Sequence, residues 1–261
     1  MKNQSTIVLP YAWDAMSARI FERKGFGYIA TTSAGIALSR GYEDGEKIPV
    51  DDMLETVKNI INAVEIPVIV DIESGYGDSV EKVLEIVKTL ISFGAAGINI
   101  EDGSNKLEQP LHSVEFQVEK IKAIRKYVNQ QNMPFIINGR TDVYWLGIND
   151  YKEALNRSIL YYEAGADNIF IPGVSAYELI LKLKKDLPCP LNILVTEKTP
   201  SLDELSNIGV EVLSLGSAQY RATVSNLENT CDDILNHQNF KTVTEEVISY
   251  NAISNYVKAG K

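Results

Sequence analysis

Two carboxylates stand two residues apart, directly after an apolar run, in the segment 67–77 (PVIVDIESGYG). The run Val68–Val70 is typical of a strand that is buried on both faces, as in a parallel sheet. Residues two apart in an extended chain point the same way, so Asp71 and Glu73 would face one spot at the end of this strand. Convergent carboxylates repel each other unless a cation or a proton lies between them. The segment therefore predicts a cation site, with a solvated acidic loop as the alternative.

The rest of the chain repeats this arrangement of a short apolar segment followed by an amphipathic helical pattern. The expected strands are 7–9, 28–31, 68–70, 97–100, 135–137, 169–171, 191–195 and 212–215. Eight such units, without a linker or a shift in composition, predict one (β/α)8 barrel domain spanning residues 1–261. A doubly wound open sheet is the rival fold. It is disfavoured by the count of eight and by the lack of a G-x-G-x-x-G motif after the first strand.

Two further helical patterns, at residues 217–237 and 242–258, exceed what a barrel needs. We expect the segment 217–261 either to pack on a neighbouring subunit or to cover its own barrel. The first possibility predicts a homo-oligomer, either a dimer or a tetramer.

The composition narrows the classes of partner. The net charge is −10, from 25 basic and 35 acidic residues, which disfavours nucleic acid and anionic membranes as partners. The isolated cysteines Cys189 and Cys231 make neither a disulfide framework nor a metal-binding pair. The sequence has no apolar run long enough to span a membrane and no long apolar stretch at its beginning. We therefore expect a cytoplasmic protein that acts on a small molecule.

In this class of barrel the active site lies at the carboxyl ends of the strands, so the residues there are candidates. They are Tyr11, Trp13, Ser33, Ala34, Gly35, Asp71, Glu73, Glu101, Asp102, Asn138, Arg140, Pro172 and Gly173, together with Glu43 and Asp44 from the long second loop. Several carboxylates around one mouth favour a hard cation, Mg²⁺ or Mn²⁺, while the lack of histidine and cysteine there argues against zinc.

Arg140 is the cation expected at this rim. Its guanidinium suits a carboxylate, phosphonate or enolate oxygen, and the alternative is a salt bridge to Glu73 or Glu101 without any ligand. The tripeptide Ser33–Gly35 offers backbone N–H groups where glycine permits a close approach. The fifth and sixth strands do not end in a lysine, so Schiff-base chemistry has no candidate nucleophile.

Six motifs occur between residues 13 and 142, in the order WDAMSARIFERKGF, ATTSAGIA, GYEDG, DIESGYG, NIEDG and NGRTD, within a longer resemblance over about residues 8–216. Together they resemble the isocitrate lyase/phosphoenolpyruvate mutase superfamily. The resemblance implies an α/β barrel that depends on Mg²⁺ and that breaks or forms a C–C or P–C bond next to a 2-oxo acid through an enolate.

The resemblance also assigns roles to residues. Asp71 would hold the metal, and Glu73, Glu101 and Asp44 would reach it, partly through water. Ser33, Ala34 and Gly35 would cradle the acidic or oxo end of the substrate, with Arg140 as the counter-charge. We accordingly expect catalytic roles for Arg140, Asp44 and Glu101. We expect substrate contacts from a set that also includes Trp13 and Asn138.

The loop after NIEDG departs from the pattern of the lyases. They carry a K-K/R-C-G-H motif there, whereas residues 103–110 read GSNKLEQP and contain no cysteine. This loop is also shorter than the gating loop of the mutases. The sequence therefore resembles a mutase-like branch that includes oxaloacetate decarboxylases. Asn105 and Lys106 either act on the substrate or lie exposed, and a catalytically silent protein that binds 2-oxo acids is the alternative function.

Overall fold

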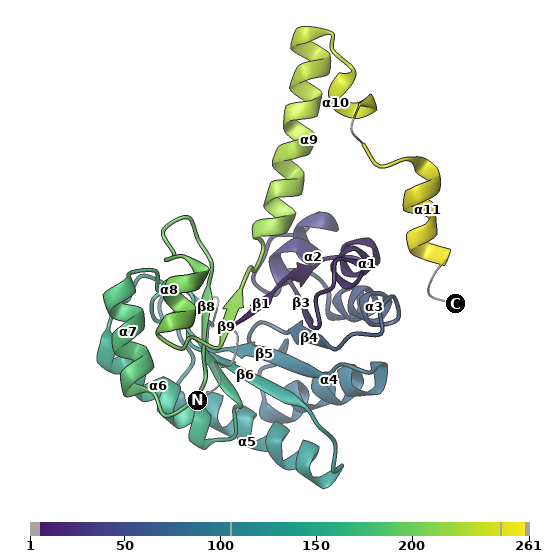
Figure 1. Ribbon diagram of the computed structural model, residues 1–261. Helices are drawn as coiled ribbons and strands as arrows, with labels where there is room; N and C mark the ends of the chain where they lie inside the picture. The colour runs from purple at the N-terminus through teal and green to yellow at the C-terminus, as the bar shows by residue number, and fades with distance from the viewer. Residues whose placement is uncertain (1–5, 105, 246, 259–261) are drawn as a thin grey trace.

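The computed structural model describes residues 6–104, 106–245 and 247–258. Nine parallel strands form a nearly closed barrel with helices on its outside (Figure 1), which confirms the predicted fold class. The strands lie in the order β1 (Ile7–Leu9), β9 (Val212–Ser214), β8 (Leu191–Leu194), β7 (Asn168–Phe170), β6 (Ile136–Arg140), β5 (Gly97–Glu101), β4 (Val68–Asp71), β3 (Ile29–Thr31) and β2 (Tyr11–Ala12).

The first strand of the barrel is divided at Pro10, so the expected count of eight strand segments was wrong by one. β1 pairs with β9 on one side, whereas β2 pairs with β3 on the other. Proline has no N–H to donate to a sheet, but the Pro10 carbonyl still accepts from the Ala30 N–H at 2.9 Å. The chain therefore crosses the seam of the barrel at this proline.

The helices that alternate with these strands are α1 (Ala15–Arg23), α3 (Val50–Ile61), α4 (Val80–Phe93), α5 (Val114–Gln130), α6 (Tyr151–Glu163), α7 (Tyr177–Asp186) and α8 (Leu202–Asn207). The structure corrects the expectation of a strand end at 33–35 followed by an irregular connection. Residues Ser33–Ser39 form helix α2 instead. The Thr32 side chain caps this helix by accepting from the Gly35 N–H at 3.1 Å, which places Ser33 in the first turn.

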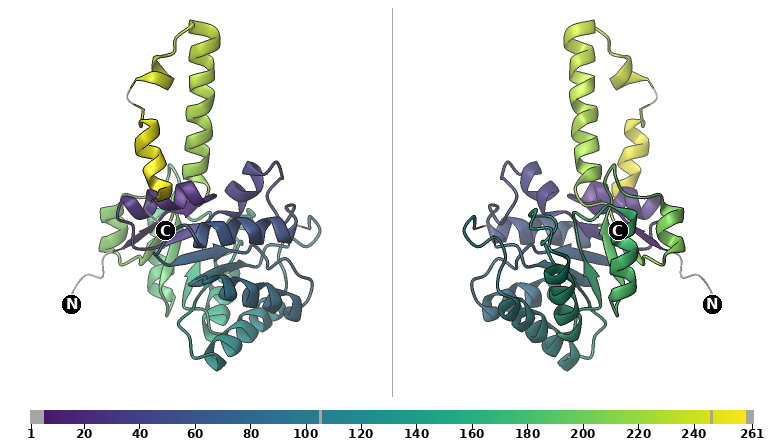
Figure 2. Two further views of the ribbon diagram at one scale, coloured as in Figure 1. Left: turned by 90° about the vertical axis from the view of Figure 1, so that its right-hand side faces the viewer. Right: turned by 90° about the vertical axis from the view of Figure 1, so that its left-hand side faces the viewer.

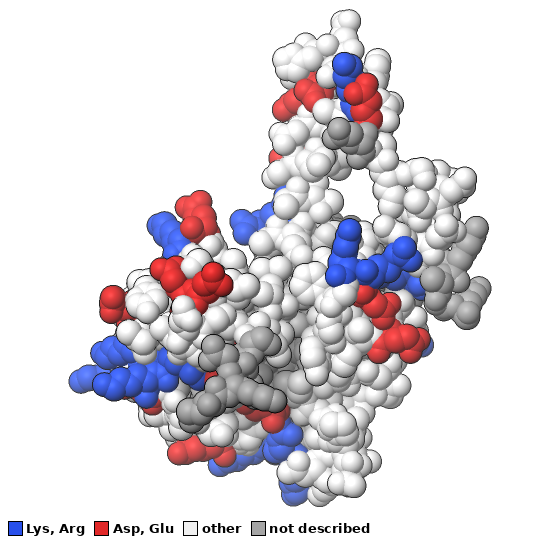
Figure 3. Space-filling view, viewed as in Figure 1, with Lys and Arg blue, Asp and Glu red and all other residues white. Residues whose placement is uncertain are grey.

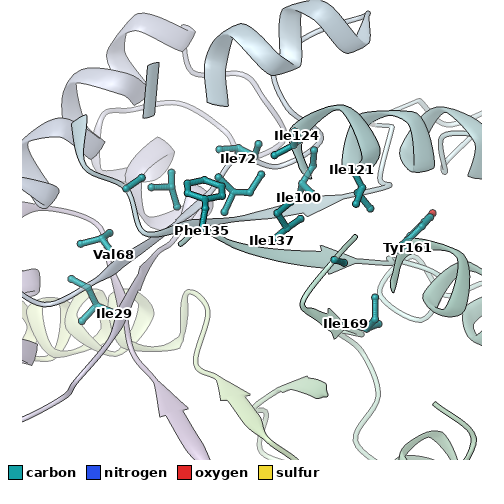
Figure 4. Packing of buried hydrophobic residues seen from close by; sticks show 14 of the residues in the cluster. Ile29, Val68, Ile72, Ile100, Ile121, Ile124, Phe135, Ile137, Tyr161 and Ile169 are labelled. Atoms are coloured by element: carbon teal, nitrogen blue, oxygen red, sulfur yellow. The ribbon is translucent and has the colours of Figure 1, made fainter. Parts of the chain in front are cut away.

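The largest apolar cluster lies between the strands and the outer helices. Ile100 and Ile137 on neighbouring strands pack beneath Ile121 and Ile124 of α5 (Figure 4). Because alternate residues of a strand face opposite sides, the intervening residues of β5 and β6 face the inside of the barrel. The register pairs Asn99 with Asn138 and Glu101 with Arg140, so this alternation brings polar side chains of both strands together inside the barrel.

The chain ends in a helical arm of α9 (Ala218–His237), α10 (Lys241–Thr244) and α11 (Tyr250–Lys258), where a single helix had been expected for residues 242–258. Figure 2 shows α9 projecting from the barrel and α11 returning toward it. No residue of α9 is buried. α11 contacts α1, where Arg19 Nη1 donates to the Tyr256 carbonyl at 2.7 Å. In the described parts of the chain, no helix has both the length and the apolarity needed to cross a bilayer.

Candidate active site

The carboxyl ends of the strands surround a cavity of about 500 Å³. A smaller cavity of about 80 Å³ adjoins it and shares Ser33, Asp44, Arg140 and Trp145 with it. The structure therefore brings together nine of the residues expected from the sequence, two of which, Tyr11 and Pro172, line the smaller cavity. Glu73 and Glu101 line the larger cavity, Ala34 and Asp71 line the smaller one, and Ser33, Asp44 and Arg140 line both.

Asp71 is the last residue of β4 and is held from two sides. Its Oδ2 accepts from the Ser33 hydroxyl at 3.0 Å, and its Oδ1 accepts from Asn99 Nδ2 at 2.9 Å. Its own N–H donates to the Thr31 hydroxyl at 2.9 Å. These contacts fix the orientation of the carboxylate before any ligand binds, which is what a metal or substrate site requires.

Glu73 reaches the mouth through a turn and not through the extended chain that the D-x-E spacing had suggested. Its φ is +51°, in the left-handed region, and Gly75 and Tyr76 follow at +116° and +54°. The carboxylate accepts from the Tyr76 hydroxyl and from the Glu46 N–H, each at 2.7 Å. A residue other than glycine stays in the left-handed region only where surrounding contacts hold it. The contacts from Tyr76 and Glu46 therefore stabilise this turn at the site.

A buried lysine, which the sequence analysis did not single out, supports this turn from below. Lys120 on α5 is fully buried, and its Nζ donates to the Ser74 carbonyl at 2.9 Å. The ammonium also lies 4.9 Å from the centroid of the Phe116 ring. Burial lowers the pKa of Lys120 to about 8. In the sequence only the helical spacing of Lys120 with Gln117 and Ile124, which are also buried, could have indicated its position.

Arg140 is clamped between two carboxylates. Its Nη1 lies 2.7 Å from Glu101 Oε2, as the register of β5 and β6 allows. Its Nε and Nη2 donate to the two oxygens of Asp142 at 2.6 and 3.1 Å. This bidentate fork uses two of the five N–H groups of the guanidinium. Asp142 lies in the NGRTD motif but was not expected as a site residue, although its spacing of two residues from Arg140 could have indicated it.

A second buried network backs this clamp. The Asp102 carboxylate is fully buried and accepts from the Thr141 hydroxyl, the Asp142 N–H and the Tyr161 hydroxyl at 2.7–2.9 Å. Arg157 Nη1 lies 3.1 Å from the same carboxylate. Asp102 therefore fixes the backbone of the residues that hold Arg140, and it does not line either cavity.

Negative charge is in excess at the mouth. In the part of the chain that the structure describes, five carboxylates and two cations, Arg140 and Lys106, line the two cavities. Burial, reinforced by the charges of Asp44 and Asp71, raises the pKa of Glu73 to about 7. Burial likewise raises the pKa of Asp44 and, against the opposing effect of Arg140, that of Glu101. These carboxyls retain protons more readily than usual, as expected where a cation is needed to balance them.

This donor set fits a hard divalent cation that makes few direct protein contacts. Among the described residues, no three acidic, histidine or cysteine side chains converge closely enough to hold a metal by themselves. Mg²⁺ commonly binds through one or two carboxylates and keeps several waters. The oriented Asp71 carboxylate, with further carboxylates around the same cavities, matches that requirement.

Three of the expected substrate contacts lie elsewhere. Trp13 packs edge-on against Tyr220 of α9, with ring centroids 5.4 Å apart, and lines a different cavity between α1 and α3. The Gly35 N–H is used by Thr32 at the start of α2. Asn138 lies inside the barrel, where its Nδ2 donates to Asn99 Oδ1 at 2.6 Å, and it lines neither mouth cavity. The structure shows these three residues in packing, capping and support, and their direct contact with a substrate stays a prediction.

The loop after β5 forms a compact rim of the larger cavity. Gly103 and Leu111 form an antiparallel bridge, and the Ser104 N–H donates to the Pro110 carbonyl at 2.9 Å. Lys106 lines the cavity, whereas Asn105 lies outside the described residues. Trp145 lines both mouth cavities, although its side chain is 55% exposed.

These features define an α/β barrel with an acidic, arginine-containing mouth. The chain matches the family model described as phosphoenolpyruvate phosphomutase over residues 1–235. It therefore belongs to this family, within the isocitrate lyase/phosphoenolpyruvate mutase superfamily, as the sequence motifs had predicted.

Individual relatives agree with this assignment. An uncharacterized protein of Mycobacterium tuberculosis is 35% identical over 217 residues, which cover 82% of this chain and 79% of the relative. The 2-methylisocitrate lyase of Escherichia coli is 29% identical over 218 residues, covering 80% and 73%. A solved structure from Burkholderia cenocepacia, titled as a lyase/mutase, has a TM-score of 0.90 at 30% identity and covers 97% of this chain and 90% of its own. The characterised relatives are lyases or mutases, which supports an enzyme of this superfamily.

On the face in Figure 3, basic and acidic side chains lie in small groups, and several basic groups adjoin acidic ones. A small-molecule substrate fits the family. The expected lack of nucleic-acid and membrane partners stays a prediction.

Proposed function

We propose that this protein is a Mg²⁺-dependent lyase or mutase that cleaves or rearranges the C–C or P–C bond next to the carbonyl of a 2-oxo acid, through an enolate. The observation that carries the proposal is the position of Arg140. Its guanidinium lines the same two cavities as Ser33 and Asp44, within an excess of carboxylates. An anionic substrate would be repelled by an acidic mouth without a built-in cation, so a clamped arginine there favours an anion as the ligand.

The residues at the mouth would have separate roles in the reaction. Arg140, held rigid by Glu101 and Asp142, would orient the substrate and offset negative charge as it develops on the C2 oxygen. A donor that is fixed beforehand needs no reorganisation during the reaction, and loss of one such donor costs about 2.7–4 kcal/mol. Ser104, Pro110 and Trp145, which line the larger cavity, would narrow the access of water to it.

Asp71 would hold the metal directly, with Asp44, Glu73 and Glu101 reaching it partly through water. When bound, Mg²⁺ supplies concentrated positive charge close to a developing oxyanion. Ser33 and Asn99 would keep the Asp71 carboxylate in the orientation that the metal needs. Mn²⁺ suits the same oxygen ligands.

The C-terminal arm supports the proposal of a homo-oligomer. It exposes large apolar side chains along its whole length, which is costly for a monomer in water. They are Val224, Leu227, Leu235, Phe240, Val243, Val247, Ile248, Tyr250 and Val257. A second copy of the chain would cover this surface in a dimer or tetramer, and we further propose a cytoplasmic location.

A product assay tests the proposed activity. Purified protein with Mg²⁺ should release pyruvate from oxaloacetate or phosphonopyruvate in a lactate dehydrogenase-coupled assay. Phosphorus NMR of phosphonopyruvate should detect a rearrangement that releases no pyruvate. EDTA should abolish the reaction, and added Mg²⁺ should restore it.

The Asp71→Asn variant is the matched control, because free metal ions also decarboxylate oxaloacetate. Turnover that is equal in this variant would contradict the proposed site. Calorimetric binding of either compound without any product would instead favour the catalytically silent binding protein.

A further inference from the structure

Glu46 joins two loops that both reach the mouth. It lies in the loop between α2 and α3, two residues after Asp44. Its N–H donates to Glu73 Oε2 at 2.7 Å. Its own Oε1 accepts from the Ser74 hydroxyl at 2.7 Å and from the Tyr76 N–H at 2.8 Å. These three hydrogen bonds, which we call the Glu46 clasp, connect the α2–α3 loop to the turn that follows β4.

The Glu46 clasp is the main polar attachment of residues 43–48. Among the described residues, the Glu46 N–H is the one backbone group of this segment that hydrogen-bonds to another element. Ile48 is buried in the largest apolar cluster and supplies an apolar anchor. Asp44 precedes both attachments and lines both mouth cavities, so its position depends on the Glu46 clasp.

The Glu46 clasp acts against a repulsion between the two loops. Asp44 and Glu73 both line the larger cavity, and burial together with the charge of Asp44 raises the pKa of Glu73. Like charges at one mouth push apart the loops that carry them. Hydrogen bonds to a carboxylate are stronger than those between neutral groups, and the clasp uses the carboxylates of both Glu46 and Glu73.

Lys120 supports the same contact from α5. Its Nζ donates to the Ser74 carbonyl at 2.9 Å, while the Ser74 hydroxyl donates to Glu46, so Ser74 is held at both ends. Burial lowers the pKa of Lys120, and the charge of Glu46 is among those that oppose this effect. The buried ammonium therefore offsets the additional negative charge that Glu46 brings close to an acidic mouth.

We propose that Glu46 is a positioning residue, whose clasp holds Asp44 and Glu73 together at the mouth before any cation binds. Glu46 lines neither mouth cavity, so it acts through the two carboxylates that do. The assignment rests on the proposed function, in which Asp44 and Glu73 reach the metal partly through water. Removal of a group that orients metal ligands from outside typically lowers the metal affinity about 10- to 100-fold.

Two substitutions separate the clasp from the charge of Glu46. Glutamine keeps the length and the accepting Oε1 of glutamate, whereas alanine removes the acceptor. Both variants lose the same charge, so the difference between them measures the clasp. In calorimetry, Glu46→Ala should bind Mg²⁺ about tenfold more weakly than Glu46→Gln does. Equal affinities in the two variants would overturn the proposal, and so would a Glu46→Ala protein that differs from Glu46→Gln in Tm alone.

Hydrogen exchange of the metal-free wild-type protein covers a variant that fails to fold. The N–H groups of Glu46 and Tyr76 are donors in the clasp. Both should exchange at least about tenfold more slowly than the N–H of Lys47, which has no partner among the described residues. Glu46→Gln should keep the protection of Tyr76, and Glu46→Ala should lose it.

The opposite exchange pattern would contradict the proposal. If Glu46 and Tyr76 exchange as fast as Lys47 until Mg²⁺ is added, the clasp forms only around the metal and does not position the carboxylates beforehand. A wild-type protein that binds no Mg²⁺ would count against the proposed function, while the exchange rates would still decide whether the clasp exists.

Discussion

Replacement of Arg140 by lysine tests whether the guanidinium is part of a working site. Lysine keeps the positive charge but cannot form the two-pronged contact with Asp142 and also reach Glu101, contacts that Arg140 makes at 2.6–3.1 Å. Because the Arg140 side chain is only 14% exposed, solvent screens these interactions weakly. A hydrogen bond to a charged group contributes about 1.5–3 kcal/mol, so losing one from a bound substrate predicts a fall of roughly 10- to 150-fold.

The assay measures kcat/KM for the compound that the enzyme converts to product. Calorimetry measures the substrate and Mg²⁺ affinities separately. Mg²⁺ affinity should survive, because arginine repels the cation. Arg125→Lys serves as the matched control, since Arg125 makes a comparable ion pair with Asp167 away from the mouth. If Arg140→Lys turns over and binds substrate like the wild type, then the guanidinium does not contact the substrate and the proposed site is misplaced.

The remaining predictions concern the metal, pH and assembly. Asp71→Asn should weaken Mg²⁺ binding by at least about tenfold in calorimetry with little change in Tm, since the residue lies at the end of its strand; unchanged affinity would refute its role as a ligand. Because the folded-state pKa of Glu73, about 7, exceeds the ordinary value of 4.5, its protonation stabilises the metal-free fold. That contribution is complete below pH 4.5 and is lost as the pH rises through 7, so urea unfolding should show stability falling across this window, and Glu73→Gln should flatten the slope. A chain truncated after Leu235 loses much of the apolar arm and should show a lower oligomeric mass by light scattering, whereas an unchanged mass would assign the arm to a covering role.

The barrel could be predicted from the sequence because its signals are local. Apolar runs of three to five residues, each followed by a helical period, appear in the order in which the strands pair. The same alternation indicated that Asp71, Glu101 and Arg140 stand at the ends of strands facing one mouth. The sequence showed that the first strand ends at Pro10. Whether Tyr11 and Ala12 then form a second strand depends on their pairing with β3, which no local sequence pattern indicates.

The sequence by itself determined which strand side chains face the inside of the barrel, because residue spacing fixes the face on which each side chain lies. Only the tertiary structure decided how those side chains are held and how far each lies from the mouth. Glu73 arrives through a left-handed turn stabilised from Glu46 and Tyr76. Asn138 has the spacing of a mouth residue but lies two residues before Arg140 on the same inward face and lines neither mouth cavity. Depth along a barrel strand and the partners across it depend on contacts between segments far apart in the chain, and those contacts form only when the barrel closes.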